Sequence, residues 1–310
     1  MTGKMPRPLD LEARRRLVPY LLVLPVFLYY AAFWLRPVLS AVVGSFMDAQ
    51  NHFTVRYYAA IFEDPVFRQA AFNTLLIVVF SVTIEFLAAF GLALLINMRF
   101  RGSGIVLAVA LIPMALPAVA VGAMWSSGLA TYGWLNSFLC RLGAIAADGK
   151  IPFLGGGRYA SMFLIILIDA WQVIPFMMII LLAGLQNLGK EYREAGYVFG
   201  ASSLTVLRKI TVPLLKPTIQ TALVLRIISA IQIWLIIVML FGYRRIPVLL
   251  EEMVFYNEVM RGPESFKISL AYSVLVAVIV SAVAVLYLRL SGPAERAAPA
   301  EPGPAGGGEP

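Results

Sequence analysis

The sequence predicts an all-α membrane protein with six transmembrane helices. Sixty per cent of its 310 residues are hydrophobic and only 14% are charged, which would leave a soluble protein with more apolar surface than one core could bury. Six apolar runs are long enough to cross a hydrocarbon layer about 30 Å thick, which takes roughly 20 helical residues. Backbone polar groups find no water inside lipid, so we expect every run to be a helix.

We expect the spans, in order, at residues 17–35, 70–97, 105–125, 159–185, 218–241 and 268–290. The first follows three arginines, as a signal peptide would, but its apolar run is long and lacks a small-residue cleavage site, which favours an uncleaved anchor. Lys and Arg are denser in the segments that share a side with the amino terminus. This bias predicts that both termini are cytoplasmic.

The predicted organisation has four parts. A cytoplasmic segment (1–16) precedes the first helix and an external segment (17–69), and the other five spans form the main transmembrane domain (70–290). The tail (291–310) is almost entirely Pro, Gly, Ala and Glu, a composition that cannot bury enough apolar area to offset its ordering entropy. We therefore expect this tail to be disordered.

Several classes of function are excluded by composition. The formal net charge is +8, but the basic residues are dispersed and form no continuous stripe, so we expect no nucleic-acid partner. One cysteine, Cys140, and one histidine, His52, make neither an intrachain disulfide nor a Cys/His zinc site, so we expect no metal. There is no GxxxxGK[ST] phosphate-binding loop, so the chain has no ATP site of its own. We expect it not to be an enzyme.

The segment 187–217 is too polar to span a membrane and too apolar for a plain linker. It predicts two short helices separated by a turn. Residues 191–198 are helix formers, Gly200 can adopt the left-handed conformation that ends a helix, and Ser202 or Ser203 can cap the next one.

Two prolines, Pro213 and Pro217, are expected to stop the second helix and turn the chain toward the fifth span. The pattern alone leaves two interpretations open. The segment is either an amphipathic loop packed against its own bundle or a surface for another protein.

This segment resembles the EAA loop of binding-protein-dependent ABC transporter permeases, whose pattern is Glu-Ala-Ala, Asp-Gly-Ala, Ile-x-Leu-Pro and a final Pro. Gly196 replaces the second Ala, Phe199 the Asp and Val212 the Leu. In that family the loop docks on a cytoplasmic ATPase, so we name 187–217 the coupling loop. The resemblance assigns ATPase docking to Glu194, Ala195, Gly196, Gly200, Ala201, Ile210, Pro213 and Pro217.

Three further stretches resemble the maltose- and trehalose-type carbohydrate permeases of the same class. They are RPVLSAVVGSF (36–46), FNTLLIVVFSVTIEFLAAFGLALLIN (72–97) and DAWQVIPFMMIILLAGLQ (169–186). The resemblance implies the MetI-like ABC importer permease fold in a prokaryotic cell membrane, and half of a translocation pathway for a sugar, oligosaccharide or polyol.

The resemblance also implies partners. These are an ABC ATPase dimer that binds ATP and Mg, a second permease subunit that is a homologue or a copy, and an extracytoplasmic solute-binding protein. The chain itself is expected to hold no cofactor. Three alternatives are an ABC permease for sn-glycerol 3-phosphate, an ion-coupled secondary transporter in which Glu85 and Asp169 carry protons or cations, and a membrane scaffold without transport.

Three charged residues fall well inside predicted spans, away from their ends, at Glu85, Asp169 and Arg226. A charge at the centre of a transmembrane helix costs about 2.5 to 3.5 kcal/mol on insertion scales, so each requires a partner or a function. One interpretation is that Glu85 and Arg226 form an ion pair within the bundle. The other is that one of the three lines the solute path.

Neutral sugars are held by hydrogen bonds to their hydroxyls and by stacking on aromatic rings. The candidates for the solute path are therefore Glu85, Asp169, Trp171, Gln172, Gln232 and Trp234. Each of the last four residue types more often packs helices together or lies at the membrane interface than binds a solute.

The last external loop is rich in charge, since it contains Glu251, Glu252, Glu258 and Glu264 together with three arginines. We expect a solvated loop, with a docking surface for a solute-binding protein as the alternative.

Overall fold

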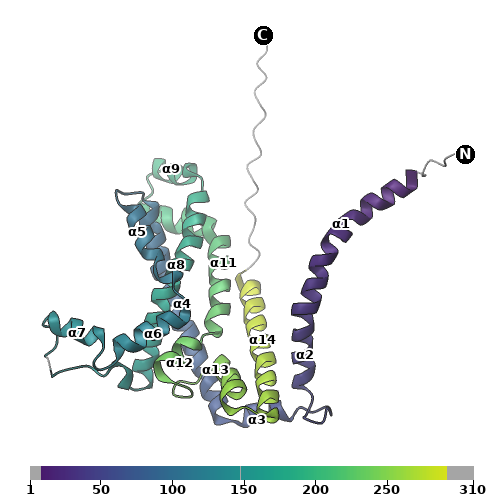
Figure 1. Ribbon diagram of the computed structural model, residues 1–310. Coiled ribbons are helices and arrows are strands. Elements are labelled where there is room, and N and C mark those ends of the chain that lie inside the picture. The colour runs from purple at the N-terminus through teal and green to yellow at the C-terminus, as the bar shows by residue number, and fades with distance from the viewer. Residues whose placement is uncertain (1–7, 147, 292–310) are drawn as a thin grey trace, which may run out of the picture.

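The computed structural model describes residues 8–146 and 148–291, and its helices are labelled in Figure 1. Within this part of the chain the β structure is one isolated bridge, between Met47 and Phe53, so the all-α prediction is confirmed. The α-helices are α1 Pro8–Tyr30, α2 Arg36–Ser45, α3 Arg56–Glu63, α4 Pro65–Asn97, α5 Ser103–Leu111, α6 Ala118–Leu129, α7 Trp134–Arg141, α8 Arg158–Asn187, α9 Lys190–Val198, α10 Ser203–Val206, α11 Val212–Ile231, α12 Leu235–Phe241, α13 Leu249–Val254 and α14 Pro263–Ser291.

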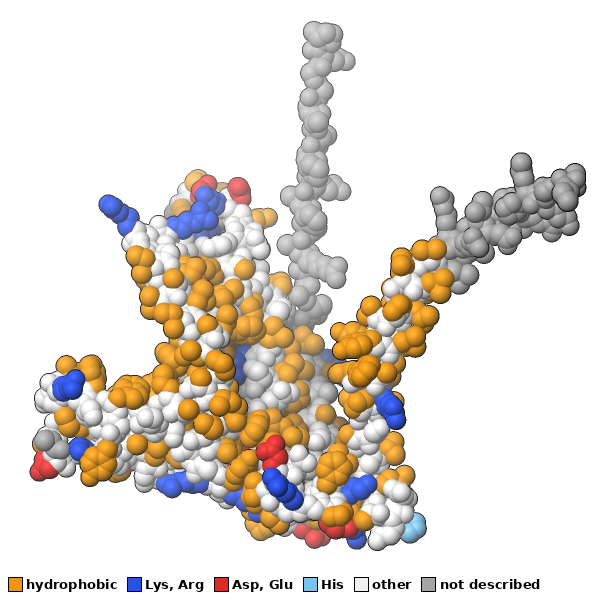
Figure 2. Space-filling view, in the orientation of Figure 1, with side chains coloured by type: hydrophobic (Ala, Val, Ile, Leu, Met, Phe, Trp, Pro, Cys, Tyr) orange, Lys and Arg blue, Asp and Glu red, His pale blue; other side chains and the backbone are white. Residues whose placement is uncertain are grey.

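The described residues contain five helices long and apolar enough to cross a membrane, and a bent pair makes a sixth. These elements follow one another in the order that the hydropathy predicts. They are Val18–Ser45, Pro65–Asn97, Ser103–Ala115 with Ala118–Leu129, Arg158–Asn187, Ser203–Ile231 and Pro263–Arg289. Figure 2 shows hydrophobic side chains along the sides of the bundle and the first helix, with charged side chains mainly near α9 and at the opposite end.

The third span is not the continuous helix that we predicted. Its two halves meet at an angle of 94°. Pro117 explains the break, because a proline disfavours helical backbone in the residue before it, and Leu116 is extended (φ −85°, ψ 132°).

The fifth span differs from the prediction at both ends. Pro213 and Pro217 do not stop the helix, which runs from Ser203 to Ile231. A wider π-helical turn, Leu207–Thr211, ends two residues before Pro213. It contains the carbonyl of Lys209, which the ring of Pro213 would meet in a regular α-helix. At the other end the helix stops before Gln232, and the chain resumes as α12 only at Leu235.

The core of the bundle is formed where α4, α8 and α11 pack together. Small side chains on α4, such as Ala89 and Ala93, face Met177 and Leu181 of α8. Helix α8 also approaches α11 so closely that a Cβ at Gly184 would lie 2.6 Å from Thr218 Cγ2. Small residues at such positions let membrane helices pack tightly without a hydrophobic driving force between them.

The first helix stands apart from the rest of the bundle. In Figure 1, α1 leans away from the body, and the apolar window of its span buries none of its residues. It continues through a π-helical turn (Ala31–Leu35) into α2, which packs on α14, where Lys267 Nζ donates to the Gly44 carbonyl (3.4 Å). Apart from Ser291, the predicted disordered tail lies outside the described residues, as does the first part of the segment 1–16.

At the opposite end of the bundle from α9, the short helices α3 and α13 cover α14 (Figure 1). Here the expectation of a solvated loop is wrong for two residues, because Glu251 and Glu252 are completely buried. Glu251 accepts hydrogen bonds from the backbone N–H groups of Arg244 and Val248, and Glu252 accepts one from Arg244 Nη2 (2.7 Å). Burial raises the pKa of Glu251 to about 7, although those two backbone hydrogen bonds act to lower it.

This shift predicts how stability depends on pH. An unfolded glutamate titrates near 4.5, so between there and about pH 7 the folded chain holds the Glu251 proton that the unfolded chain has released. Stability should therefore fall as pH rises through this window and change little from this group above it. We expect the melting temperature of the purified protein to be several degrees lower at about pH 8 than at about pH 5.

Glu251→Gln should remove the part of this dependence that Glu251 contributes, since an amide does not titrate, and leave the part due to Glu252, whose pKa burial also raises. Glu258→Gln, at an exposed acid of the same loop, is the matched control and should retain the full dependence. An unchanged pH profile in Glu251→Gln would contradict the assignment.

Candidate functional site

A cluster of three charged side chains lies inside the bundle, one from each of its central helices. Arg226 of α11 reaches both oxygens of the Glu85 carboxylate on α4, with 2.9 Å between Nη2 and Oε1. The same Nη2 contacts Asp169 Oδ2 on α8. The side chains of Arg226, Glu85 and Asp169 are only 3%, 0% and 7% exposed, so the cluster is enclosed by protein.

Two serines complete the hydrogen bonding of the cluster. Ser81 Oγ lies 2.5 Å from Glu85 Oε1 and 3.0 Å from Asp169 Oδ2, and it can donate to one of them at a time. Ser229 Oγ accepts from Arg226 Nη1 (3.2 Å). Each serine lies three or four residues from its charged neighbour, which places the two on one face of a helix, so this spacing is a sequence signal that could have identified both.

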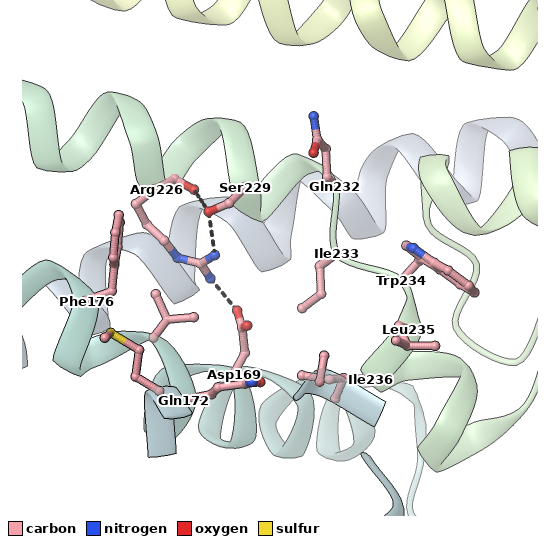
Figure 3. A pocket seen from close by; sticks show the side chains of 13 residues that line it. Asp169, Gln172, Phe176, Arg226, Ser229, Gln232, Ile233, Trp234, Leu235 and Ile236 are labelled. Carbon is pink, nitrogen blue, oxygen red and sulfur yellow. Dashed lines mark hydrogen bonds and ion pairs between the residues drawn. The ribbon is translucent and has the colours of Figure 1, made fainter. Parts of the chain in front are cut away.

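A cavity of about 530 Å³ lies beside this cluster. It is bounded by α8, by the break between α11 and α12, and by Met114 and Ala118 at the bend of the third span. In Figure 3, Asp169 and Arg226 point toward each other at one side of the cavity and Trp234 lies at the other. The full lining is Met114, Ala118, Asp169, Gln172, Val173, Phe176, Arg226, Ser229, Gln232, Ile233, Trp234, Leu235 and Ile236.

Two interrupted helices therefore meet at one cavity. Irregular backbone inside a membrane is tolerated where it is enclosed by protein or lines a polar space, and discontinuous helices commonly form transport sites. Gln172 supports the bend, because its Nε2 donates to the Leu116 carbonyl (3.1 Å). Among the described residues its side-chain oxygen has no hydrogen-bond donor, which leaves it available to a molecule in the cavity.

The structure brings four of the six solute-path candidates together at the cavity: Asp169, Gln172, Gln232 and Trp234. The Gln232 amide points away from Asp169 in Figure 3, so it lies at the rim.

The other two candidates lie elsewhere. Glu85 is completely buried in the charged cluster and does not line the cavity. Trp171 packs edge-to-face on Trp125, with 5.8 Å between ring centroids. The sequence interpretation missed Phe176, which follows Gln172 by four residues and so shares its face of α8.

The coupling loop forms the end of the bundle that carries α9 (Figure 1). Gly200 follows α9 in the left-handed conformation (φ +77°), and the Ser202 hydroxyl accepts from the Thr205 N–H (3.3 Å) to cap α10. Gly196 is buried against the following helix, since a Cβ there would lie 2.8 Å from Ile210 Cδ1. The Ala201 N–H donates to the Gly196 carbonyl (3.0 Å), which closes the turn.

The outer face of this loop is exposed and partly apolar. Glu194 and Ala195 are exposed on α9, and Val198 and Phe199 at its end are 84% and 90% exposed. Phe199 stands where the EAA pattern has an acid, so the tip of the turn offers an aromatic ring in place of a carboxylate.

Comparison with known proteins gives a family match over most of the chain. The family described as "Binding-protein-dependent transport system inner membrane component" matches residues 85–292. This range contains the three charged residues of the cluster, the cavity and the coupling loop.

Individual proteins are similar over comparable lengths. The trehalose/maltose transport system permease protein MalF of Thermococcus litoralis is 31% identical, over 75% of this chain and 79% of its own. The sulfoquinovosyl glycerol transport system permease protein SmoG of Agrobacterium fabrum is 34% identical, over 70% and 67%. The trehalose transport system permease protein SugA of Mycobacterium tuberculosis is 30% identical, over 76% and 74%.

Among solved structures, a chain of a bacterial alginate ABC transporter, in complex with an alginate pentasaccharide-bound periplasmic protein, has the same fold. Its TM-score is 0.79, with 92% of this chain and 97% of that chain covered. The sequence identity is 21%, so this likeness concerns the fold alone.

Proposed function

Because the chain belongs to the family of binding-protein-dependent transport system inner membrane components, we propose that it forms half of the translocation pathway of an ABC importer for a carbohydrate. It is an inner-membrane permease subunit and not an enzyme. The observation that carries the proposal is the cavity between the two interrupted helices, with Asp169, Gln172 and Trp234 in its wall. The names of the similar trehalose/maltose and trehalose permeases support a carbohydrate.

The cavity wall has the chemistry that a sugar requires. The Asp169 carboxylate and the free oxygen of Gln172 are acceptors for sugar hydroxyls, which are hydrogen-bond donors. Trp234 offers an aromatic surface for the apolar face of a sugar ring. A volume of about 530 Å³ is within the range of small-molecule sites.

The partners follow from this function. The coupling loop would dock on an ATPase dimer, which binds the ATP and Mg that this chain has no site for, and a second permease, a homologue or a copy, would supply the other half of the pathway. A solute-binding protein would deliver the carbohydrate. Closure of the ATPase dimer would draw the two coupling loops together and expose the cavity to one side of the membrane at a time.

The alternatives are less well supported. An ion-coupled secondary transporter does not belong to this family, and here both candidate ion carriers, Glu85 and Asp169, are held by Arg226. A scaffold without transport gives no reason for a polar cavity at the meeting point of two broken spans.

Replacement of Gln232 and Trp234 together by alanine tests the solute path. We expect uptake of radiolabelled trehalose and maltose by the complete transporter to fall at least about tenfold, with the larger part due to Trp234, which loses its stacking surface. Complex assembly should be largely retained, because both residues are in the short connection between α11 and α12, although Trp234 also packs at the edge of a buried cluster.

The matched control is the double alanine variant of Gln186 and Trp34, an exposed amide and an exposed indole away from the cavity. Its uptake should equal that of the native protein. Normal uptake by the Gln232/Trp234 variant would place the solute path elsewhere.

A further inference from the structure

The charged side chains in the cavity wall, Asp169 and Arg226, affect which solutes can bind there. We propose that the cavity selects carbohydrates by charge, admitting neutral and cationic ones and excluding anionic ones, with Asp169 as the selecting residue. This inference rests on the proposed function, and it narrows the substrate class at the same site.

The only basic side chain in the described cavity wall is Arg226, and its guanidinium group is already engaged on every nitrogen. Nε and Nη2 contact Glu85, Nη2 also contacts Asp169, and Nη1 donates to Ser229. Nη1 has a second N–H, which is the one donor that an anionic sugar could reach, and a two-point contact would require it to displace a carboxylate held between packed helices. The charge of Arg226 is therefore already balanced by Glu85 and Asp169.

The formal charge of the cluster is not positive as long as at least one of its two acids is ionised. Two carboxylates against one guanidinium give one negative charge when both acids are ionised, and none when one of them holds a proton. In both states the cavity lacks the positive charge that a carboxylate, phosphate or sulfonate group would need to replace its hydration. Charges interact strongly in such an enclosed, weakly screened space.

Asp169 is the acid that the solute would meet. Glu85 lies behind Arg226 and does not reach the cavity, whereas Asp169 lines it. Its Oδ2 is occupied by Arg226 and Ser81, while its Oδ1 accepts no hydrogen bond from the described residues. That oxygen can accept from a sugar hydroxyl or an ammonium group, and it repels an anion.

This charge rule would separate the chain from two proteins that it resembles: SmoG, whose name gives sulfoquinovosyl glycerol, a sulfonated and therefore anionic sugar, and a transporter that shares its fold. The similar solved structures include a transporter for the import of the acidic polysaccharide alginate. Because the likeness at 21% identity is one of fold, the solute must be inferred from the side chains in the cavity, and these disfavour an acidic sugar.

The test compares three trisaccharides that differ in charge. The complete transporter is placed in nanodiscs of an uncharged lipid, and tryptophan fluorescence is followed as maltotriose (neutral), trigalacturonate (anionic) or the glucosamine trimer (cationic) is added. Trp234 lines the cavity and serves as the reporter, and Trp234→Phe identifies the part of the signal that arises there. We expect trigalacturonate to bind at least about tenfold more weakly than maltotriose, which is about 1.4 kcal/mol.

Two variants, Asp169→Asn and Gln232→Lys, test whether the cavity is where neutral and anionic sugars are distinguished, and each has a control. Asp169→Asn should raise the ratio of trigalacturonate to maltotriose affinity at least about tenfold, whereas Asp169→Glu, which keeps the charge, should leave that ratio low. Gln232→Lys adds a cation at the exposed rim without touching the cluster, so it should also raise the ratio even if Asp169→Asn fails to fold. Gln186→Lys, away from the cavity, is its control.

The outcomes distinguish the two proposals. Equal binding of all three sugars, or a ratio that neither Asp169→Asn nor Gln232→Lys changes, would overturn the charge rule and leave the carbohydrate function intact. Failure of every trisaccharide to bind would overturn the solute cavity itself, and the charge rule with it.

Discussion

Arg226→Gln is expected to prevent assembly of a stable transporter. The change leaves Glu85 and Asp169 buried beside each other without the cation that compensates them. Breaking a buried ion pair by removing one partner costs about 3–5 kcal/mol, a large part of the stability of a typical protein. The measurement is the yield of folded complex after detergent extraction, together with its melting temperature.

The matched control removes the three charges together, in the triple variant Glu85→Gln, Asp169→Asn and Arg226→Gln. Uncharged groups of similar shape remove the desolvation penalty, so this variant should recover most of the lost yield. A single Arg226→Gln variant that assembles as well as the native protein would show that the cluster is not needed for stability. A triple variant as unstable as the single one would show that shape rather than charge is decisive.

Gly200→Val is expected to release the ATPase from the permease or to uncouple ATP hydrolysis from uptake. Gly200 has φ +77°, and a β-branched side chain is strongly disfavoured in this left-handed region, at a cost of about 1–3 kcal/mol. The strain would shift the turn that places Val198 and Phe199 at the exposed tip. Uptake per ATP hydrolysed should fall at least about tenfold in reconstituted vesicles.

Two controls separate strain from side-chain size. Gly200→Asn should retain most of the coupling, because asparagine tolerates the left-handed conformation. Gly91→Val introduces the same side chain at an exposed helical position with no neighbouring atom within 4 Å, and it should couple normally. Normal coupling in Gly200→Val would count against the docking of this turn on an ATPase.

The six spans could be predicted because the bilayer imposes a local rule, the length of an apolar run. The interruptions could not, because proline acts according to its surroundings. Pro117 breaks the third span, whereas Pro213 follows a π-helical turn and Pro217 lies inside α11, and the helix continues past both. Which outcome occurs depends on how neighbouring helices satisfy the freed backbone groups, as Gln172 does for Leu116.

The candidate site, like the fold, could be predicted only in part. The cost of a charge in lipid indicates that Glu85 and Arg226 need partners, and the structure joins them. That Asp169 also reaches Arg226 depends on the rotation of α8 about its axis, which one sequence does not give. The same rotation turns Gln172 to the cavity and its neighbour Trp171 to Trp125, although the two are adjacent in the chain.

The continuous helix Ser203–Ile231 has a mechanical consequence. Its 29 residues span about 43 Å at 1.5 Å per residue, from the coupling loop to the rim of the cavity. A rigid rod of this length that tilts by about 10° around its midpoint moves each end by about 4 Å. The helix contains a π-helical turn and two prolines but no break, so a displacement that begins at Ser203 can be carried along it to Gln232. The connection to α12 is the first interruption of the helix after the coupling loop.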